Sequence, residues 1–139
     1  MNNPESLQKT ILIAIGDDAI RSTLLGILAN DHYKVIGVEN APGALELIAT
    51  EHIQAFVVES RTDDLDGIEL CTRIRALPRY QMTPVILITD SDDPDEHRRA
   101  FEAGCDDVID PDQLGDVLEL RVRSQIEKAE RFQRLERAH

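Results

Sequence analysis

No apolar run in the sequence approaches the ~20 residues that a helix needs to span a bilayer. The opening stretch, MNNPESLQKT, lacks the basic start and the apolar core of a signal peptide. The two cysteines, Cys71 and Cys105, form no CxxC pair, which favours reduced, structural thiols. Together these absences predict a cytoplasmic protein that has no membrane partner.

Sequence motifs for several kinds of chemistry are also missing. There is no glycine-rich phosphate loop, nucleophile elbow or metalloprotease motif. The histidines show no ligand spacing with one another or with the cysteines. The acidic run at residues 90–97 lacks the glycine and the final glutamate of a calcium loop, and the run at residues 62–67 is an equally weak metal motif. We therefore expect no metal site and no enzymatic activity.

Positive charge is scarce except at the C-terminal end. The net charge is -12, which argues against nucleic-acid binding by the chain as a whole. Residues 1–120 carry 9 Lys and Arg against 24 Asp and Glu, whereas residues 121–139 carry 6 against 3. The shift predicts an acidic domain followed by a basic helix. We expect an N-terminal tail at residues 1–9, one domain at 10–123 and an extended C-terminal helix or linker at 124–139.

Short apolar runs alternate with segments of helical periodicity. The runs are residues 11–15, 33–38, 55–58, 84–89 and 106–109. Alternation of this kind predicts an α/β fold, with a parallel sheet, right-handed crossovers and helices on both faces. Helix boundaries are also indicated: Asp17 caps the first helix, Asn40 or Ala41 opens the second, and Gly104 stops the fourth.

The carboxyl ends of the predicted strands are where such sheets place their functional crevice. These ends are residues 15–18, 59–61, 89–91 and 109–112. In the stretch AFVVESRTDDLDG, a buried strand delivers Glu59 to that edge. Glu59 is therefore the first candidate for a functional side chain.

Four blocks, ILIAIGDDAIR, DLDGIEL, TPVILIT and FEAGCDDVI, follow one another at a characteristic spacing. Through them, residues 10–126 resemble the receiver domain of bacterial two-component response regulators. The resemblance implies a flavodoxin-like (βα)5 fold, with a doubly wound five-stranded parallel sheet of order 2-1-3-4-5. It also implies an aspartate that accepts a phosphoryl group, an acid pair that holds Mg²⁺ with it, a hydroxyl and a lysine that contact the phosphoryl group, and an aromatic switch.

Most of these positions hold other residues here. The metal-binding acid pair corresponds to Ile15 and Gly16, and the phospho-acceptor to Glu59. The hydroxyl is kept as Thr89. The lysine corresponds to Pro111, or to Asp110 if a gap is allowed, the proline that usually follows it to Asp112, and the aromatic switch to Val108.

These changes predict a degenerate receiver domain, a pseudo-receiver, that has lost its Mg²⁺ ligands and uses no cofactor. Phosphoryl transfer depends on positioning and charge neutralisation, and both are weakened. Glu59 is then either a permanent stand-in for a phospho-aspartate or a hydrogen-bonded acid at a strand end, with Thr89 as a possible partner. A register slip that makes Asp17 and Asp18 the acid pair would require a deletion at the helix start.

A domain of this kind would act through protein partners in signal transduction. We expect the interaction face on the fourth helix, the fifth strand and the fifth helix, with these residues: Arg98, Arg99, Phe101, Leu118, Arg121 and Val122. Coiled-coil or helix-packing dimerisation through the last helix and a solvated helical linker both remain open. Since that helix reaches His139 without a stop signal, we expect part of a longer protein or a domain that works by pairing. The competing functions are a working phospho-acceptor that uses Glu59 or a nearby Asp, and a structural dimerising spacer for an output domain.

Overall fold

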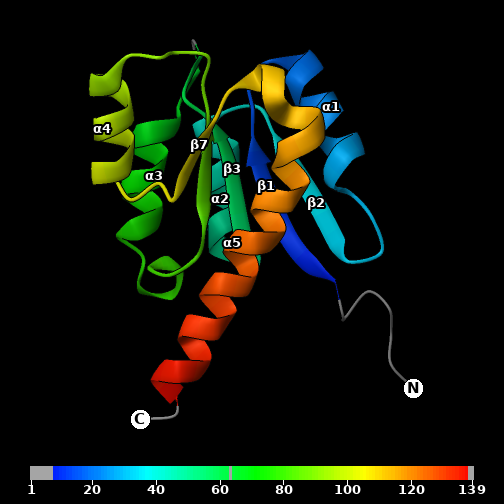
Figure 1. Ribbon diagram of the computed structural model, residues 1–139, viewed down its shortest axis with the longest axis vertical. Coiled ribbons are helices and arrows are strands. Elements are labelled where there is room, and N and C mark those ends of the chain that lie inside the picture. Colours follow the sequence, from blue (N-terminus) through cyan, green and yellow to red (C-terminus); the bar gives the residue numbers. More distant parts are fainter. Residues whose placement is uncertain (1–7, 63, 138–139) are drawn as a thin grey trace.

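The computed structural model describes residues 8–62 and 64–137. Its centre is a five-stranded parallel sheet of order β2-β1-β3-β6-β7, drawn in Figure 1. The strands are β1 (Lys9–Ala14), β2 (Tyr33–Val38), β3 (Ala55–Glu59), β6 (Val85–Ile88) and β7 (Asp107–Ile109). Numbered along the chain, these five strands have the predicted order 2-1-3-4-5, so the flavodoxin-like fold is confirmed.

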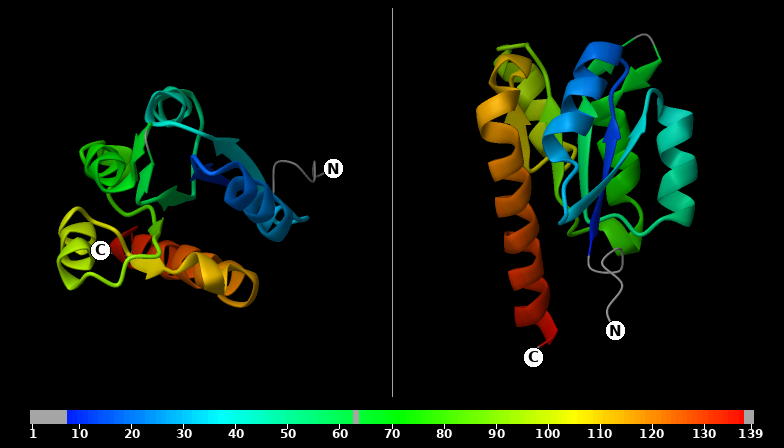
Figure 2. Two further views of the ribbon diagram at one scale, coloured as in Figure 1. Left: turned by 90° about the horizontal axis from the view of Figure 1, so that it is seen from above. Right: turned by 90° about the vertical axis from the view of Figure 1, so that its right-hand side faces the viewer.

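Helices cover both faces of the sheet, as the two views in Figure 2 show. They are α1 (Asp18–Leu28), α2 (Ala41–Thr50), α3 (Gly67–Arg75), α4 (Pro94–Glu102) and α5 (Leu114–Arg137). Side chains of α1 and α5 pack in one core cluster, and those of α2, α3 and α4 pack in the other. Successive strand residues alternate between the two clusters, because side chains of a strand point to opposite faces.

Local sequence determines several helix boundaries. The Asp17 side chain accepts a hydrogen bond from the Ile20 N–H and caps α1, and the Asn40 side chain caps α2 through the Gly43 N–H. Gly104, just past α4, has φ +106°, a conformation that favours glycine. These three predictions are confirmed.

Four short elements in the described part of the chain were not apparent from the sequence. A two-stranded antiparallel hairpin, β4 (Arg61–Thr62) and β5 (Leu65–Asp66), follows β3 directly. Two 3-10 turns, η2 (Pro78–Tyr80) and η3 (Pro111–Gln113), precede β6 and α5. Elements of two or three residues are too short to show a hydrophobic period.

The N-terminal boundary differs from the prediction by one residue. Lys9 already belongs to β1, where it pairs with Tyr33 of β2. Gln8 directly precedes this strand, and the first seven residues of the predicted tail lie outside the described residues. No helix in the described part of the chain is long and apolar enough to cross a membrane.

The longest helix, α5, has 24 residues and changes character along its length. A stripe at every fourth position is buried against the sheet: Leu114, Leu118, Val122 and Ile126. Residues 131–137 are exposed, and Figures 1 and 2 show this end of α5 projecting beyond the sheet. An ion pair of 2.9 Å from Lys9 to Glu130 holds the helix near the point where it leaves the domain.

The burial of this stripe corrects part of the predicted interaction face. Leu118 and Val122 are both 0% exposed, because their spacing of four places them on the side of α5 that packs on the sheet. They therefore belong to the hydrophobic core and are not available to a partner.

Candidate functional site

The carboxyl ends of β3, β6 and β7 meet the start of α1 around a cavity of about 280 Å³. Its wall includes Asp17, Glu59, Thr89, Glu96 and Pro111. The structure thus brings together three of the residues singled out from the sequence, Glu59, Thr89 and Pro111. Among the described residues that line this cavity, the exposed Arg61 alone is positively charged.

Glu59 is the last residue of β3, and its half-buried side chain turns toward the loop after β1. Its Oε1 atom accepts hydrogen bonds from the backbone N–H groups of Gly16 at 2.9 Å and Asp17 at 3.2 Å. The contact places a negative charge beside the amino end of α1, where the helix dipole favours it. The carboxylate is thus bound to the backbone of its own chain, as expected for a hydrogen-bonded acid at a strand end.

The two positions of the expected acid pair lie in the loop that Glu59 contacts. Ile15 is 0% exposed and belongs to the core cluster of α1 and α5. At Gly16 an added Cβ would lie 2.6 Å from Oγ1 of Thr62, so a side chain there requires Thr62 to move. Neither position offers a side-chain oxygen to a metal ion.

The nearby acids Asp17 and Asp18 have other partners. Asp17 caps α1, and Asp18 forms an ion pair with Arg21 at 2.5 Å. Both acids therefore interact with the first turn of α1, which argues against a register slip that would make them the metal-binding pair. Within residues 8–62 and 64–137, no group of three or more His, Cys, Asp or Glu side chains is placed to hold a metal ion.

Thr89 directly follows β6. Its side chain is 8% exposed and is hydrogen-bonded to α4. Its Oγ1 donates to Oε2 of Glu96 at 3.1 Å and accepts from the Ser91 N–H at 3.1 Å. The other carboxylate oxygen of Glu96 accepts from the Ser60 hydroxyl at 3.1 Å. The structure corrects the expected pairing of Glu59 with Thr89, because Thr89 donates to Glu96 instead.

Glu96 is the site residue that sequence reasoning missed. It lies in the first turn of α4, inside the acidic run 90–97, where acids are expected simply because they favour a helix start. Only the fold shows that Glu96 faces two hydroxyls from the ends of β3 and β6. Its position three residues after the α4 cap, Asp93, is the one signal that could have singled it out from its acidic neighbours.

The remaining two predicted positions lie along β7 and just after it. Pro111 opens η3, which Asp110 caps by accepting from the Asp112 N–H at 2.8 Å. Val108 is partly buried in β7, pairs with Leu87 of β6 and packs against the core cluster of α2, α3 and α4. An aliphatic side chain thus stands at the place of the aromatic switch.

The arginines of the expected interaction face are exposed, but each has an acidic partner in its own chain. Arg98 bonds to Asp95 and to Glu102, the latter at 3.1 Å. Its hydrogen bond to Asp95 holds the pKa of that carboxyl below its ordinary value. The other two pairs are Arg99 with Asp95 at 3.5 Å and Arg121 with Asp107 at 2.7 Å.

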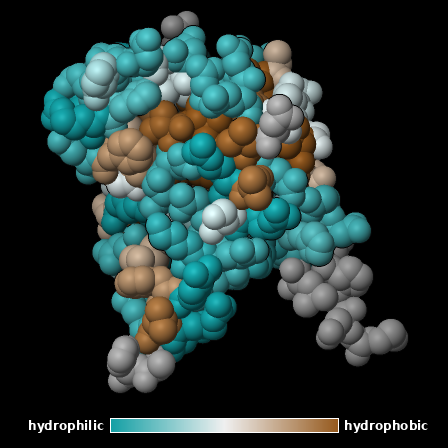
Figure 3. All heavy atoms as spheres, in the orientation of Figure 1, coloured by the Kyte–Doolittle hydropathy of each residue, from teal (hydrophilic) through white to brown (hydrophobic). Residues whose placement is uncertain are grey.

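Apolar surface remains on the same face. Phe101 of α4 is 52% exposed and Leu120 of α5 is 56% exposed. Figure 3 shows hydrophobic side chains gathered between α4 and α5 in the upper half of the molecule. Arg98, Arg99 and Arg121 are paired with acids of the same chain, so these apolar side chains are the part of the face most available to a partner.

The fold and the overall sequence agree with one family. Residues 11–123 match the model of the response regulator receiver domain. The chain belongs to this family. Receiver domains are signalling domains of two-component systems, in which response regulators interact with histidine kinases and other proteins.

Several curated relatives support this assignment. The transcriptional regulatory protein AfsQ1 of Streptomyces coelicolor is 30% identical over 122 residues, which cover 88% of this chain and 53% of that protein. The response regulator MprA of Mycolicibacterium vanbaalenii is 30% identical over 99 residues, covering 71% of this chain and 42% of that protein. This receiver domain thus spans about half the length of the curated relatives it matches.

Solved structures agree on the fold. The receiver domain of a signal transduction histidine kinase from Syntrophus aciditrophicus has 26% identity and a TM-score of 0.78, covering 86% of this chain and 91% of that one. The receiver domain of an HD domain-containing protein from Pseudomonas fluorescens has 22% identity and a TM-score of 0.83, covering 92% and 93%. The second similarity concerns the fold alone.

Proposed function

We propose that this receiver domain does not accept a phosphoryl group and signals by binding another protein. The observation that carries the proposal is the pair of hydrogen bonds from Gly16 and Asp17 to Glu59. A carboxylate that accepts two backbone N–H groups is stabilised in one orientation and is a poor nucleophile there. On the sequence grounds given above, we place this function in the cytoplasm.

The residues present do not fit the Mg²⁺ ion that the family implies. Mg²⁺ requires near-octahedral oxygen ligation and is usually held by one or two carboxylates. Ile15 is buried and apolar, and Gly16 has no side chain, so the acid pair supplies no oxygen. Phosphoryl transfer at this site would therefore lack the cation that neutralises the charge of the phosphoryl group.

The hydroxyls at the site are also engaged. Ser60 and Thr89 both donate to the Glu96 carboxylate, which therefore takes up the hydrogen bonds that an incoming phosphoryl oxygen would need. A phosphoryl group on Glu59 would in addition be repelled by Glu96 across the same cavity. The arrangement supports a domain with one fixed shape at the start of α4.

We predict that a small phosphodonor will not label this domain. Residues 1–139 incubated with acetyl phosphate and Mg²⁺ should show no added phosphoryl group by intact-mass spectrometry, since the metal ligands are missing. A receiver domain that carries the aspartate and the acid pair, treated in parallel, shows that the reagent is active.

The variant Glu59→Gln makes an unexpected label interpretable. A Mg²⁺-dependent mass gain that disappears in Glu59→Gln would identify Glu59 as a working acceptor. A gain that persists in the variant would point to a nearby Asp. Either result would overturn the proposal and support the competing phospho-acceptor function.

A second candidate function, dimerisation through α5, has its own structural support. Phe132 is 44% exposed and Leu135 is 60% exposed on the part of α5 that projects beyond the sheet. Apolar side chains three residues apart lie on one face of a helix, so the two can pack against a second helix. A dimer formed this way would hold an attached output domain in register.

We predict that the full chain is a dimer and that residues 1–130 are a monomer. The shorter chain keeps Ile126, which is 2% exposed, and the Lys9–Glu130 ion pair, so its core is intact. Light scattering on a sizing column gives both masses. The double variant Phe132→Glu/Leu135→Glu in the full chain should match the shorter one.

The other outcomes also discriminate. If the full chain and the shorter chain are both dimers, the dimer contact lies on the α4–α5 face around Phe101 and Leu120. Two monomers would exclude self-association and leave a different protein as the partner.

A further inference from the structure

Outside the site, two thiols from distant parts of the chain lie together. Cys71 is in α3 and Cys105 is in the loop that leads into β7. Both are free, and they are 0% and 5% exposed in the same core cluster. Cys71 also contacts the segment that carries Cys105, through a hydrogen bond to Ala103, two residues before the second thiol. A pair of adjacent thiols can react in ways that a single buried thiol cannot.

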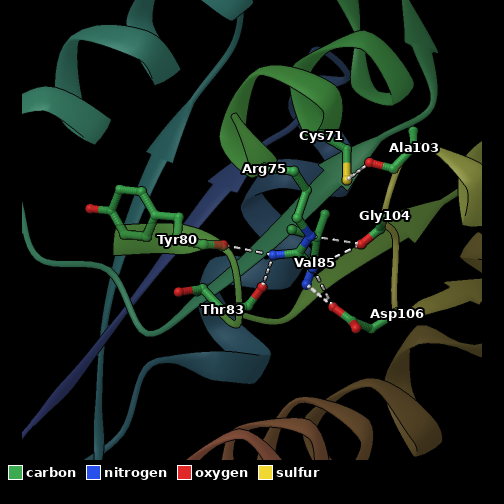
Figure 4. A network of polar contacts seen from close by, with 8 residues as sticks. All are labelled: Cys71, Arg75, Tyr80, Thr83, Val85, Ala103, Gly104 and Asp106. Carbon is green, nitrogen blue, oxygen red and sulfur yellow. Dashed lines mark hydrogen bonds and ion pairs between the residues drawn. The ribbon is translucent and has the colours of Figure 1, made fainter. Parts of the chain in front are cut away.

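The loop that carries Cys105 is held firmly against α3. The Cys71 sulfur donates to the Ala103 carbonyl at 3.5 Å, and Figure 4 shows this thiol pointing at the loop. One turn later on α3, Arg75 donates to the Gly104 carbonyl at 2.8 Å and 3.1 Å. Two anchors on one side of the helix therefore keep the thiols close, which raises their effective concentration toward each other.

The two thiols differ in acidity. Interaction with the Cys105 thiol, aided by the nearby charge of Arg75, lowers the pKa of Cys71. The same interaction, together with burial, raises the pKa of Cys105. Because the thiolate is the nucleophile, Cys71 is the sulfur that attacks first and Cys105 the one that resolves.

We propose that Cys71 and Cys105 form a dithiol that a peroxide converts to a disulfide between α3 and the loop before β7. The Cys71 thiolate attacks one peroxide oxygen, the O–O bond breaks, and a sulfenic acid and one water form. Cys105 then attacks the Cys71 sulfur, the S–O bond breaks, and a second water leaves as the S–S bond forms. Two thiols lose two electrons in total, and hydrogen peroxide is reduced to two waters.

The cross-link would close a loop that contains β6 and α4. Closing a loop of this length restricts the unfolded chain and stabilises the domain. It would also fix α3 relative to α4, the helix that carries Glu96 and the exposed Phe101. In a reducing compartment such disulfides are transient and sense oxidants, so the pair would make this face respond to peroxide. This inference does not rest on the proposed function.

The test uses the full chain, treated with increasing hydrogen peroxide and then with an alkylating reagent. Digestion with trypsin should yield residues 62–73 joined to residues 100–121, with a mass lower by two hydrogen atoms than the sum of the two peptides. Dithiothreitol should release both. The oxidised chain should melt several degrees higher than the reduced chain.

Single variants Cys71→Ala and Cys105→Ala are the controls, with circular dichroism to show that they are folded. Each should lack the joined peptide and show no rise in melting temperature with peroxide. The wild-type comparison between reduced and oxidised chain stands even if a variant is unstable. Thiols that remain unmodified until the chain unfolds, or that proceed to sulfinic acid or to a link between two chains, would overturn the proposal.

Discussion

Replacing Arg75 with alanine is expected to destabilise the domain by ~3 kcal/mol or more, because a charged, largely buried hydrogen-bonding hub would be lost. Its side chain is only 19% exposed. Figure 4 shows it reaching from α3 into the space between two loops. The guanidinium donates to the carbonyls of Gly104, Tyr80 and Thr83 and forms an ion pair of 2.8 Å with Asp106.

The cost is large because one guanidinium joins three separate segments of the chain. These are the loop after α4, η2 and the segment before β6, which would lose their common contact at once. Asp106 also accepts from the Val85 N–H at 2.8 Å, so its carboxylate links the arginine to the first residue of β6. Unpaired carbonyls cost free energy when they stay buried, and the three segments must rearrange to reach water.

Urea unfolding followed by circular dichroism measures the change in free energy. The matched control is Arg73→Ala, two positions earlier on the same helix. Arg73 is 59% exposed and, among the described residues, makes one ion pair, of 3.4 Å with Glu69, so its loss should cost no more than ~0.5 kcal/mol. If the two variants unfold at the same urea concentration, the hub is not a major source of stability.

The hub also shows what could and could not be predicted from the sequence. Strands were predictable because buried apolar runs and turn signals are local, and the cap residues Asp17 and Asn40 were predictable for the same reason. Arg75 carries no such signal, since its partners lie 5 to 31 residues away along the chain. Hydrogen bonds from a side chain to distant backbone carbonyls depend on the tertiary structure, which cannot be derived from a single sequence.

The candidate site, too, was only partly predictable from the sequence. The position of Glu59 at a strand end was predictable from a run of apolar residues followed by an acid, and its meeting with Thr89 and Pro111 follows from the parallel sheet. The partners of Glu59 and Thr89 were not predictable, because they depend on which rotamers the loop of α1 and the first turn of α4 allow. The error at Leu118 and Val122 arose because helical spacing identifies an apolar face but not what covers it.

Replacing Gly67 with alanine is expected to have a still larger effect, ~4 kcal/mol or more of lost stability. An added Cβ would lie 2.1 Å from the backbone oxygen of Glu59, a distance that no relaxation of a side chain can relieve. Gly67 is the first residue of α3, and its N–H donates to the Ser60 carbonyl at 2.8 Å. Relief of the clash would require α3 to move away from the end of β3, or the end of β3 to leave the sheet.

Thermal and urea unfolding of Gly67→Ala would measure the loss, with Gly26→Ala as the control. Gly26 lies within α1, and apart from the backbone of its own helix nothing lies within 4 Å of an added Cβ, so alanine there should stabilise the domain by ~0.5–1 kcal/mol through its higher helix propensity. The same substitution thus has opposite signs at two helical positions, which separates crowding from propensity. A Gly67→Ala variant as stable as wild type would mean that α3 does not approach the backbone of Glu59 this closely, and the geometry of the site would have to be revised with it.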